Sequence, residues 1–134
     1  MKEIFAIFVA IGAVWHVENA SQGGVTMINF GGHCKTEHFN GTILQGGVDT
    51  QRHFTADSTL LSARYMMEGT DGAGKPCKVY VDNQAILPNP SGLTRPTYIT
   101  DSEYLQAFQK DSIFGKMDFT QEGLYIRVYA VERQ

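Results

Sequence analysis

Closely spaced turn signals are the feature of this chain that most restricts its fold. They are Gly23-Gly24, Gly31-Gly32, Asn40-Gly41, Gly46-Gly47, Asp71-Gly72-Ala73-Gly74 and Glu122-Gly123. Antiparallel neighbours can be joined by such tight turns, whereas parallel strands need long crossover connections. Fourteen glycines against four prolines, with 11% aromatic residues, favour the same solution. The pattern predicts an all-β chain, built as an antiparallel sandwich or barrel.

The segments between the turns have the length and composition of strands. The predicted strands cover residues 3–15, 25–30, 33–39, 42–46, 49–54, 58–68, 77–83, 97–100, 113–120 and 124–132. One short helix is predicted after Thr100, because Thr100 and Glu103 have the spacing of a capping box. Three prolines in segment 87–96 remove ladder donors, so this segment is predicted to be a surface loop that could cover a barrel mouth.

Length and charge exclude several classes of function. The 134 residues suit one domain, spanning residues 1–134. Eleven Lys plus Arg against fourteen Asp plus Glu give a net charge of −3 without charge blocks, so neither nucleic acid nor an acidic membrane is an expected partner. Segment 69–76 contains glycines and a lysine but lacks P-loop spacing, and it is predicted to be a hairpin turn. No nucleotide fingerprint is present, and no cofactor is expected.

The uncharged run from Ile4 to Trp15 has two interpretations. It resembles the core of a signal peptide, and at twelve residues it is too short for a transmembrane helix. It also fits a long first strand that is apolar on both faces. The charge of Glu3 cancels that of Lys2, so the residues before the uncharged run are not basic, as they would be in a signal peptide. We therefore expect a strand, and a cytoplasmic protein.

Histidine and cysteine side chains suggest no metal centre. The cluster with metal-type side chains consists of His33, Cys34, Glu37, His38 and His53. On strands, no face would carry more than two of these locally, and zinc needs three or four ligands. Cys34 and Cys77 are too few for a disulfide framework, and two unpaired buried thiols are expected rather than one bridge.

Polar side chains follow one face of several predicted strands. Because alternate residues point to opposite faces, Asp49, Gln51 and His53 share a face. The same alternation separates two further pairs, Arg64 from Tyr65 and Tyr80 from Asn83. Such faces are either the solvated outside of a sheet or the lumen of a closed barrel. In a lumen, Asp49 and Arg64 could form a buried pair that serves recognition more than stability.

Three motifs resemble those of a family of small proteins catalogued as domain of unknown function 3237. They are Gly46-Gly47-Val48-Asp49-Thr50-Gln51, Ala63-Arg64-Tyr65 and Val79-Tyr80-Val81-Asp82-Asn83. The resemblance extends over almost the whole chain and implies a closed or nearly closed antiparallel β-barrel of calycin-like shape. The chain departs from the family pattern at Gln45, Ser62 and Ala85, where the family usually has proline, aspartate and glycine. The change at Ser62 weakens the case for shared acid–base chemistry.

The resemblance and the strand faces together define a candidate site. The family's polar positions fall on Asp49, Gln51, Arg64, Tyr80 and Asn83. Asp49 is the best-placed acid or base, ahead of Asp71, Asp82 and Asp101, and Arg64 or Tyr80 would steady developing negative charge. Contacts to a ligand are expected from Gln51, His53, Tyr65, Met66, Met67 and Asn83.

Three functions are compatible with this site. The first is a non-enzymatic barrel that binds a small organic molecule with a polar head. The second is a cofactor-independent isomerase, cyclase or lyase that acts on a small metabolite by acid–base chemistry. The third, compatible with both, is a homo-oligomer such as a dimer, with an interface on the apolar first strand and on the face of Tyr125, Arg127 and Tyr129.

Overall fold

The chain forms nine strands and one short helical segment in the residues that the structure describes. A computed structural model describes residues 1–55 and 57–133. The strands are β1 (Lys2–Asn19), β2 (Gly23–Lys35), β3 (Phe39–Ile43), β4 (Val48–Thr55), β5 (Ser58–Asp71), β6 (Pro76–Leu87), β7 (Leu93–Thr100), β8 (Ser112–Phe119) and β9 (Leu124–Val131). A helix, α1 (Glu103–Gln106), continues into a 3₁₀ turn, η1 (Ala107–Lys110).

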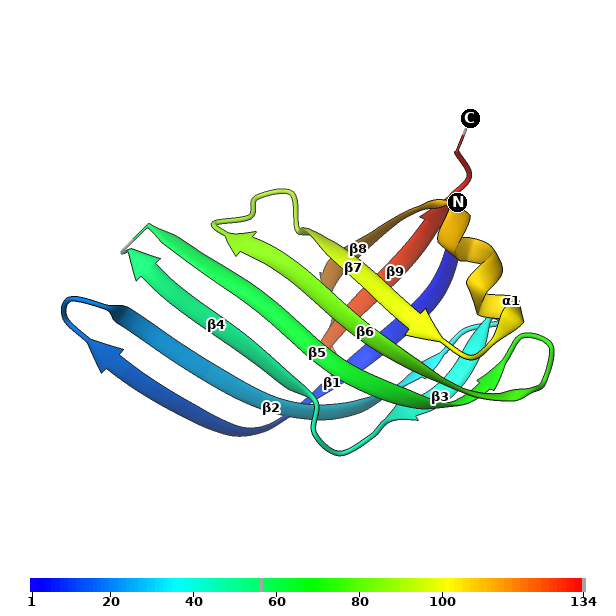
Figure 1. The fold of residues 1–134 in the computed structure, drawn as a ribbon, viewed down its shortest axis with the longest axis horizontal. Helices are drawn as coiled ribbons and strands as arrows, with labels where there is room; N and C mark the ends of the chain where they lie inside the picture. Colours follow the sequence, from blue (N-terminus) through cyan, green and yellow to red (C-terminus); the bar gives the residue numbers. More distant parts are fainter. Residues whose placement is uncertain (56, 134) are drawn as a thin grey trace.

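Antiparallel pairing closes these strands into a ring (Figure 1). The order runs β1-β9-β8-β7-β6-β5, and β5 then pairs with both β3 and β4. Those two strands in turn pair with β2, which returns to β1. The predicted all-β, antiparallel, nearly closed barrel with one short helix is therefore confirmed.

The glycine pair at residues 31 and 32 does not form the predicted turn. Strands expected at 25–30 and 33–39 are largely one strand, β2, which ends at Lys35. Gly32 has a φ of 141°, and a Cβ there would overlap the carbonyl oxygen of Phe8. The glycine therefore permits β1 and β2 to approach each other closely without interrupting their ladder.

The proline-rich segment is shorter as a loop than predicted. β7 already begins at Leu93 and includes Pro96, which lies opposite Asn83 of β6. A proline is tolerated there because β7 pairs with β8 only through Leu93 and Thr94, so Pro96 has no ladder partner on that side.

The short helix starts later than its predicted cap. Ser102, not Thr100, is the N-cap residue, and its hydroxyl accepts a hydrogen bond from the Leu105 N–H at 3.1 Å. Thr100 ends β7, where its hydroxyl donates to the carbonyl oxygen of Lys78 at 2.7 Å. No helix within residues 1–55 and 57–133 is long and apolar enough to cross a bilayer.

One half of the barrel is solid. Its core contains fully buried side chains from several strands and from the helix, including Phe5, Phe39, Met67, Val79 and Leu105. Phe5 packs edge-on against Phe39, with the ring centroids 5.7 Å apart. The helix lies at this end, near the start of β1 and the end of β9 (Figure 1). Cys34 and Cys77 belong to this core and are unpaired, as predicted.

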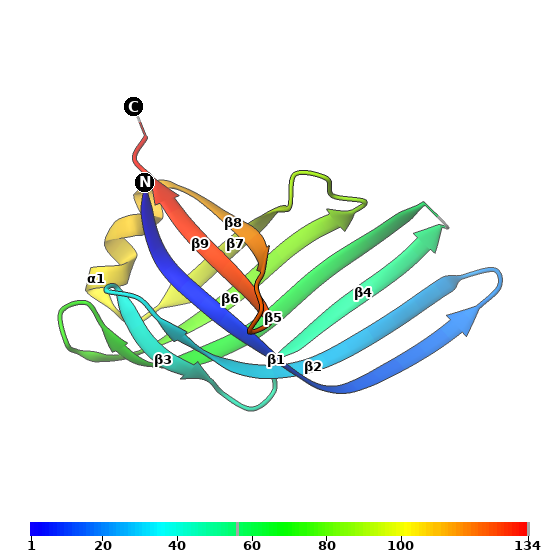
Figure 2. The ribbon, with the colours of Figure 1, turned by 180° about the vertical axis from the view of Figure 1, so that it is seen from behind.

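The other half is open because its strands have unequal lengths. β1 pairs with β9 only as far as Phe8, whereas its pairing with β2 continues to Asn19. β1 and β2 therefore extend beyond β9 as a shelf, which β4 and β5 continue (Figure 2). On this shelf the apolar end of β1 is exposed, with Trp15 65% accessible. The predicted subunit interface on β1 stays a prediction.

Steric room at two glycines provides a test of this packing. A Cβ on Gly69 would overlap the carbonyl oxygen of Asn40 in the neighbouring strand, whereas a Cβ on Gly31 would meet nothing within 4 Å. Gly69→Ala is expected to lower the free energy of unfolding by about 2 kcal/mol or more, because β3 must move away from β5. Gly31→Ala should be neutral or stabilising by up to about 1 kcal/mol. Urea denaturation of both variants checks the difference, and equal stabilities would contradict the β3–β5 register.

Candidate functional site

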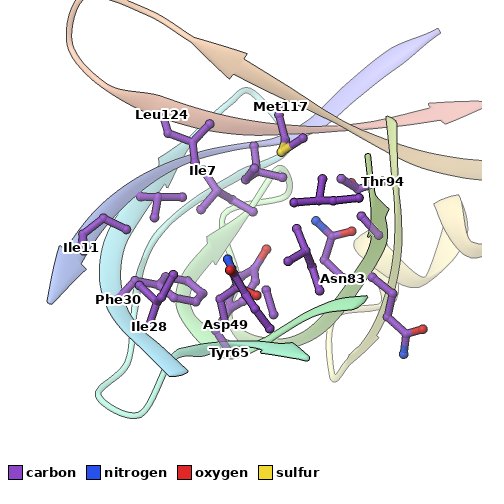
Figure 3. A pocket seen from close by; sticks show the side chains of 18 of the residues that line it. Ile7, Ile11, Ile28, Phe30, Asp49, Tyr65, Asn83, Thr94, Met117 and Leu124 are labelled. Atoms are coloured by element: carbon purple, nitrogen blue, oxygen red, sulfur yellow. The ribbon is translucent and has the colours of Figure 1, made fainter. Parts of the chain in front are cut away.

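The open half of the barrel encloses a cavity of about 370 Å³. Its walls are mostly apolar and come from strands all around the ring (Figure 3). Ile7 of β1, Met117 of β8 and Leu124 of β9 form one wall, and Phe30 of β2 and Tyr65 of β5 lie across from them. A space of this size is within the range of small-molecule sites.

Cross-strand register brings two polar residues to the same side of this cavity. Ile28 pairs with Asp49, Asp49 with Ala63, and Ala63 with Asn83. These four residues form one row across β2, β4, β5 and β6, and all of them line the cavity. Two steps of antiparallel pairing separate the Cα atoms of Asp49 and Asn83 by about 10 Å. Only the methyl group of Ala63 stands between them, so both side chains reach the same space (Figure 3).

Three buried side-chain oxygens of residues that line the cavity lack a hydrogen-bond partner among the described residues. They are Oδ1 of Asp49, Oδ1 of Asn83 and Oγ1 of Thr94. The Asn83 and Thr94 residues are only 7% and 5% exposed. Burying such a group without a partner costs about 1–3 kcal/mol. Such groups are few in a folded chain, and all three belong to residues that line this one cavity.

Asp49 is a partly buried acid in mostly apolar surroundings. Burial raises the pKa of its carboxyl group, and a hydrogen bond from Gln51 opposes part of that rise. The Gln51 Nε2 atom donates to Oδ2 of Asp49 at 3.1 Å. Among the described residues that line the cavity there is no lysine, arginine or histidine to hold the carboxylate ionised. Asp49 can therefore accept hydrogen bonds as a carboxylate or donate one as an acid.

The predicted pair between Asp49 and Arg64 is wrong. Arg64 pairs in register with Val48, one residue away from Asp49, and this places its side chain on the outer face. That side chain is 61% exposed, and its Nε lies 3.7 Å from Oδ2 of Asp82. Strand alternation thus sends Arg64 outward because it sends the neighbouring Tyr65 inward.

Tyr80 also does not reach the cavity. It lies in β6 between Met66 and Ile99 of the adjacent strands, both of which are exposed. Its neighbours Val79 and Val81 are buried in the core, so Tyr80 faces outward. The role predicted for Arg64 and Tyr80, steadying negative charge in the lumen, has no support in their positions.

Three of the residues predicted to contact a ligand line the cavity. Gln51 and Asn83 are polar members of its wall, and Tyr65 packs edge-on against Phe30 with centroids 5.3 Å apart. Burial raises the pKa of the Tyr65 hydroxyl, which therefore stays protonated. His53 lies beyond the cavity, where its ring nitrogens contact the hydroxyls of Thr26 and Thr59 at 3.1 and 2.9 Å.

The two methionines predicted to contact a ligand lie elsewhere in the barrel. Met67 belongs to the solid core, and Met66 is 38% exposed on the outer face. Met117 and Thr94 line the cavity instead, although the sequence motifs do not include them. Thr94 falls in the segment predicted to be a loop, which hides its strand parity. For Met117, the alternation within the strand predicted at 113–120 is a usable signal.

The remaining carboxylates have structural contacts at a distance from the cavity wall. Asp71 accepts hydrogen bonds from the Ser102 hydroxyl at 2.6 Å and from the N–H groups of Ala73 and Lys75. These bonds hold the pKa of Asp71 below its usual range. Asp71 therefore ties the β5–β6 hairpin, which occurs where it was predicted, to the start of the helix.

Three solved structures resemble this chain over most of its length. A protein of unknown function from Clostridium acetobutylicum ATCC 824 aligns with a TM-score of 0.77 and 21% identity, covering 98% of both chains. A conserved protein of unknown function from Rhodopseudomonas palustris gives 0.74 and 24%, covering 95% of this chain and 93% of that one. A β-barrel-like protein from Acinetobacter baumannii AYE gives 0.69 and 14%, covering 94% and 90%. At these identities the likeness shows the fold alone.

A family model extends the comparison to the sequence. The family, described as "Protein of unknown function (DUF3237)", matches residues 1–131. No curated protein sequence matches the chain.

Replacing Asp49 by asparagine is expected to stabilise the protein near neutral pH. The pKa of Asp49 is raised in the folded protein. Below the ordinary carboxyl pKa, Asp49 is protonated in both the folded and the unfolded chain, so its burial does not lower the free energy of unfolding there. As the pH rises through the folded-state pKa, the free energy of unfolding falls, because the folded protein must then hold a charged carboxylate in a mostly apolar place. Asparagine removes this charge, so the free energy of unfolding should rise by about 1 kcal/mol at pH 7.5 and stay unchanged near pH 3.5.

Urea denaturation at the two pH values measures this effect. Asp82→Asn is the control, since Asp82 lies on the outer face beside Arg64 and its loss should lower stability slightly or not at all. An Asp49→Asn protein less stable than the parent at pH 7.5 would contradict a partly buried carboxyl group whose charge is not offset.

Proposed function

Since this chain belongs to the DUF3237 family of proteins of unknown function, we propose a function from its cavity: the barrel binds a small organic molecule that has an apolar body and a polar head. One observation carries the proposal. Three buried side-chain oxygens without hydrogen-bond partners among the described residues belong to residues that line one mostly apolar cavity. A ligand that met them would relieve a desolvation cost and bury apolar surface in the same step.

The apolar wall supports the body of such a ligand. Side chains from β1, β2, β8 and β9, among them Ile7, Ile28, Met117 and Ile126, face the cavity. Contact with them would favour binding by about 25 cal/mol for each Å² of apolar surface removed from water. Met117 adds a flexible side chain that can adapt to different shapes.

The polar row supports recognition of the head. Asp49 and Asn83 approach the same space from β4 and β6, and Gln51 fixes the orientation of the Asp49 carboxyl group. Few, well-placed polar groups in an apolar pocket are the usual source of orientation and specificity.

A second candidate is a cofactor-independent isomerase, cyclase or lyase. The favouring observation is the raised pKa of Asp49, which brings a carboxyl group closer to the pH at which it can exchange protons efficiently. Asp49 would take a proton from one carbon or oxygen of the substrate and return it to another. With Arg64 and Tyr80 outside, the Asn83 amide is the polar group best placed to donate a hydrogen bond to developing negative charge.

Filling the cavity is expected to abolish binding. Ala63 lines the cavity between Asp49 and Asn83, so the Ala63→Trp side chain would occupy the space of the ligand. Affinity for the neutral probe N-phenyl-1-naphthylamine, followed by fluorescence, should fall by about 10-fold or more, the loss of at least 1.4 kcal/mol. Ser62→Trp, one residue earlier on the outer face, should bind as the parent does. Equal binding by both variants would place the ligand elsewhere.

Asp49→Asn separates a binder from an enzyme. Metabolites that stabilise the protein in a thermal-shift screen are incubated with it, and NMR follows their conversion. A ligand present at a hundred times its Kd adds about 2.7 kcal/mol of stability, enough to detect. If Asp49 is an acid–base catalyst, the variant should lose turnover by about 10² or more while still binding. Turnover that survives the substitution would remove Asp49 from the mechanism.

A further inference from the structure

We infer that the cavity selects ligands by charge and hydrogen-bond polarity: its ligand is neutral or cationic, with a head that donates hydrogen bonds, and anions of the same shape are rejected. The inference rests on the proposed binding function and specifies the class of molecule that the same site accepts. It follows from which charges line the cavity, which atoms lack partners, and where these lie in the barrel.

The charged groups of the cavity wall have one sign. Among the described residues that line it, Asp49 is the sole aspartate, and there is no glutamate, lysine, arginine or histidine. Arginines that might offset this charge are engaged on the outer face. Arg64 lies beside Asp82, and Arg127 donates to Asp118 at 2.8 Å and to Glu3 at 3.3 Å. An anion entering this apolar space would find no counter-charge and would meet the carboxyl group of Asp49.

The unpartnered side-chain oxygens are suited to accept hydrogen bonds. Oδ1 of Asn83 is an amide oxygen and accepts hydrogen bonds at any pH. Oδ1 of Asp49 accepts them when the carboxyl group is ionised. Oγ1 of Thr94 can accept or donate. The amide nitrogen of Gln51 donates to Oδ2 of Asp49, so Oδ1 of that carboxyl group is the oxygen left for a ligand. Hydroxyl, amide N–H and ammonium groups can donate to these three oxygens, whereas a carboxylate or phosphate anion has no hydrogen to offer the Asp49 carboxylate and is repelled by its charge.

The positions of these atoms orient the ligand. Asp49 and Asn83 lie on the β4–β6 side, and Ile7, Met117 and Leu124 lie on the opposite wall (Figure 3). A bound molecule would therefore place its donor group between Asp49 and Asn83, over the small side chain of Ala63. Its apolar body would face β1, β8 and β9. An ammonium group, with three donors and a positive charge, is the strongest match for a carboxylate and an amide oxygen.

A matched set of four ligands tests the inference. All share one naphthalene body: 2-naphthylmethylamine, 2-naphthylmethanol, 2-methylnaphthalene and 2-naphthoate. Their affinities for the protein are measured by ligand-observed NMR at pH 7.5. We expect the amine to bind about 10-fold or more tightly than the hydrocarbon, since hydrogen bonds to a charged group are the stronger kind, and the alcohol to bind about 3- to 10-fold more tightly. The carboxylate should bind at least about 10-fold more weakly than the alcohol.

Two variants assign the preference to Asp49. Asp49→Asn should reduce the advantage of the amine over the alcohol to less than about 3-fold, because it removes the counter-charge but keeps a polar side chain. It should also reduce the difference in affinity between 2-naphthoate and the alcohol. Asp82→Asn, on the outer face, should leave the affinities of all four ligands unchanged. Circular dichroism spectra establish that both variants are folded.

The outcomes separate this inference from the proposed function. If none of the four molecules binds, and a wider neutral set also fails to bind, the binding function itself is contradicted. If the carboxylate binds as tightly as the amine or the alcohol, the barrel is a binding protein but the inferred polarity is wrong. If Asp49→Asn retains the full preference for the amine, the selectivity does not come from Asp49.

Discussion

The register between β2, β4, β5 and β6 decides what this barrel can do. Because side chains alternate along a strand, one fixed pairing sends Asp49 and Asn83 into the lumen and sends Arg64 and Tyr80 out of it. A slip of one residue in β5 alone would replace Ala63 by a larger or charged neighbour and close the space between the two polar groups. The site is therefore a property of strand pairing, and no single motif contains it.

The two halves of the barrel have complementary physical roles. The closed half buries Phe5, Phe39, Met67 and Leu105 completely and is covered by the helix. The open half contains a cavity and several polar atoms that lack partners among the described residues, and both features oppose folding. A dense core at one end allows a less favourable arrangement at the other. This division is common where a site needs groups that folding alone would not select.

Strand parity is accessible from the sequence, and the direction of each face is not. Alternation along the chain is enough to group Asp49 with Gln51 and to separate Arg64 from Tyr65. The more apolar side of β5, which carries Tyr65, points inward, whereas β4 turns its polar side of Asp49 and Gln51 inward. The polarity of a face therefore does not by itself show which way that face points. The choice depends on pairing with β4 and β6, which is non-local. Gly32 suggests a turn and Pro96 suggests a loop, but both residues lie in strands. The reasons are the close approach of β1 to β2 at Gly32 and the missing β8 partner of Pro96, and both depend on tertiary structure.

The unequal lengths of β1 and β9 have a kinetic consequence. Beyond Phe8, β1 has no ladder partner on the β9 side among the described residues, so the rim of the lumen is already parted there. Under the proposed binding function, a ligand that enters beside this end of β1 breaks no backbone hydrogen bond between β1 and β9. The rates at which a ligand enters and leaves the lumen would then depend on diffusion and on its fit to the cavity. They would not depend on a slow separation of strands, which a barrel with a fully paired rim would require.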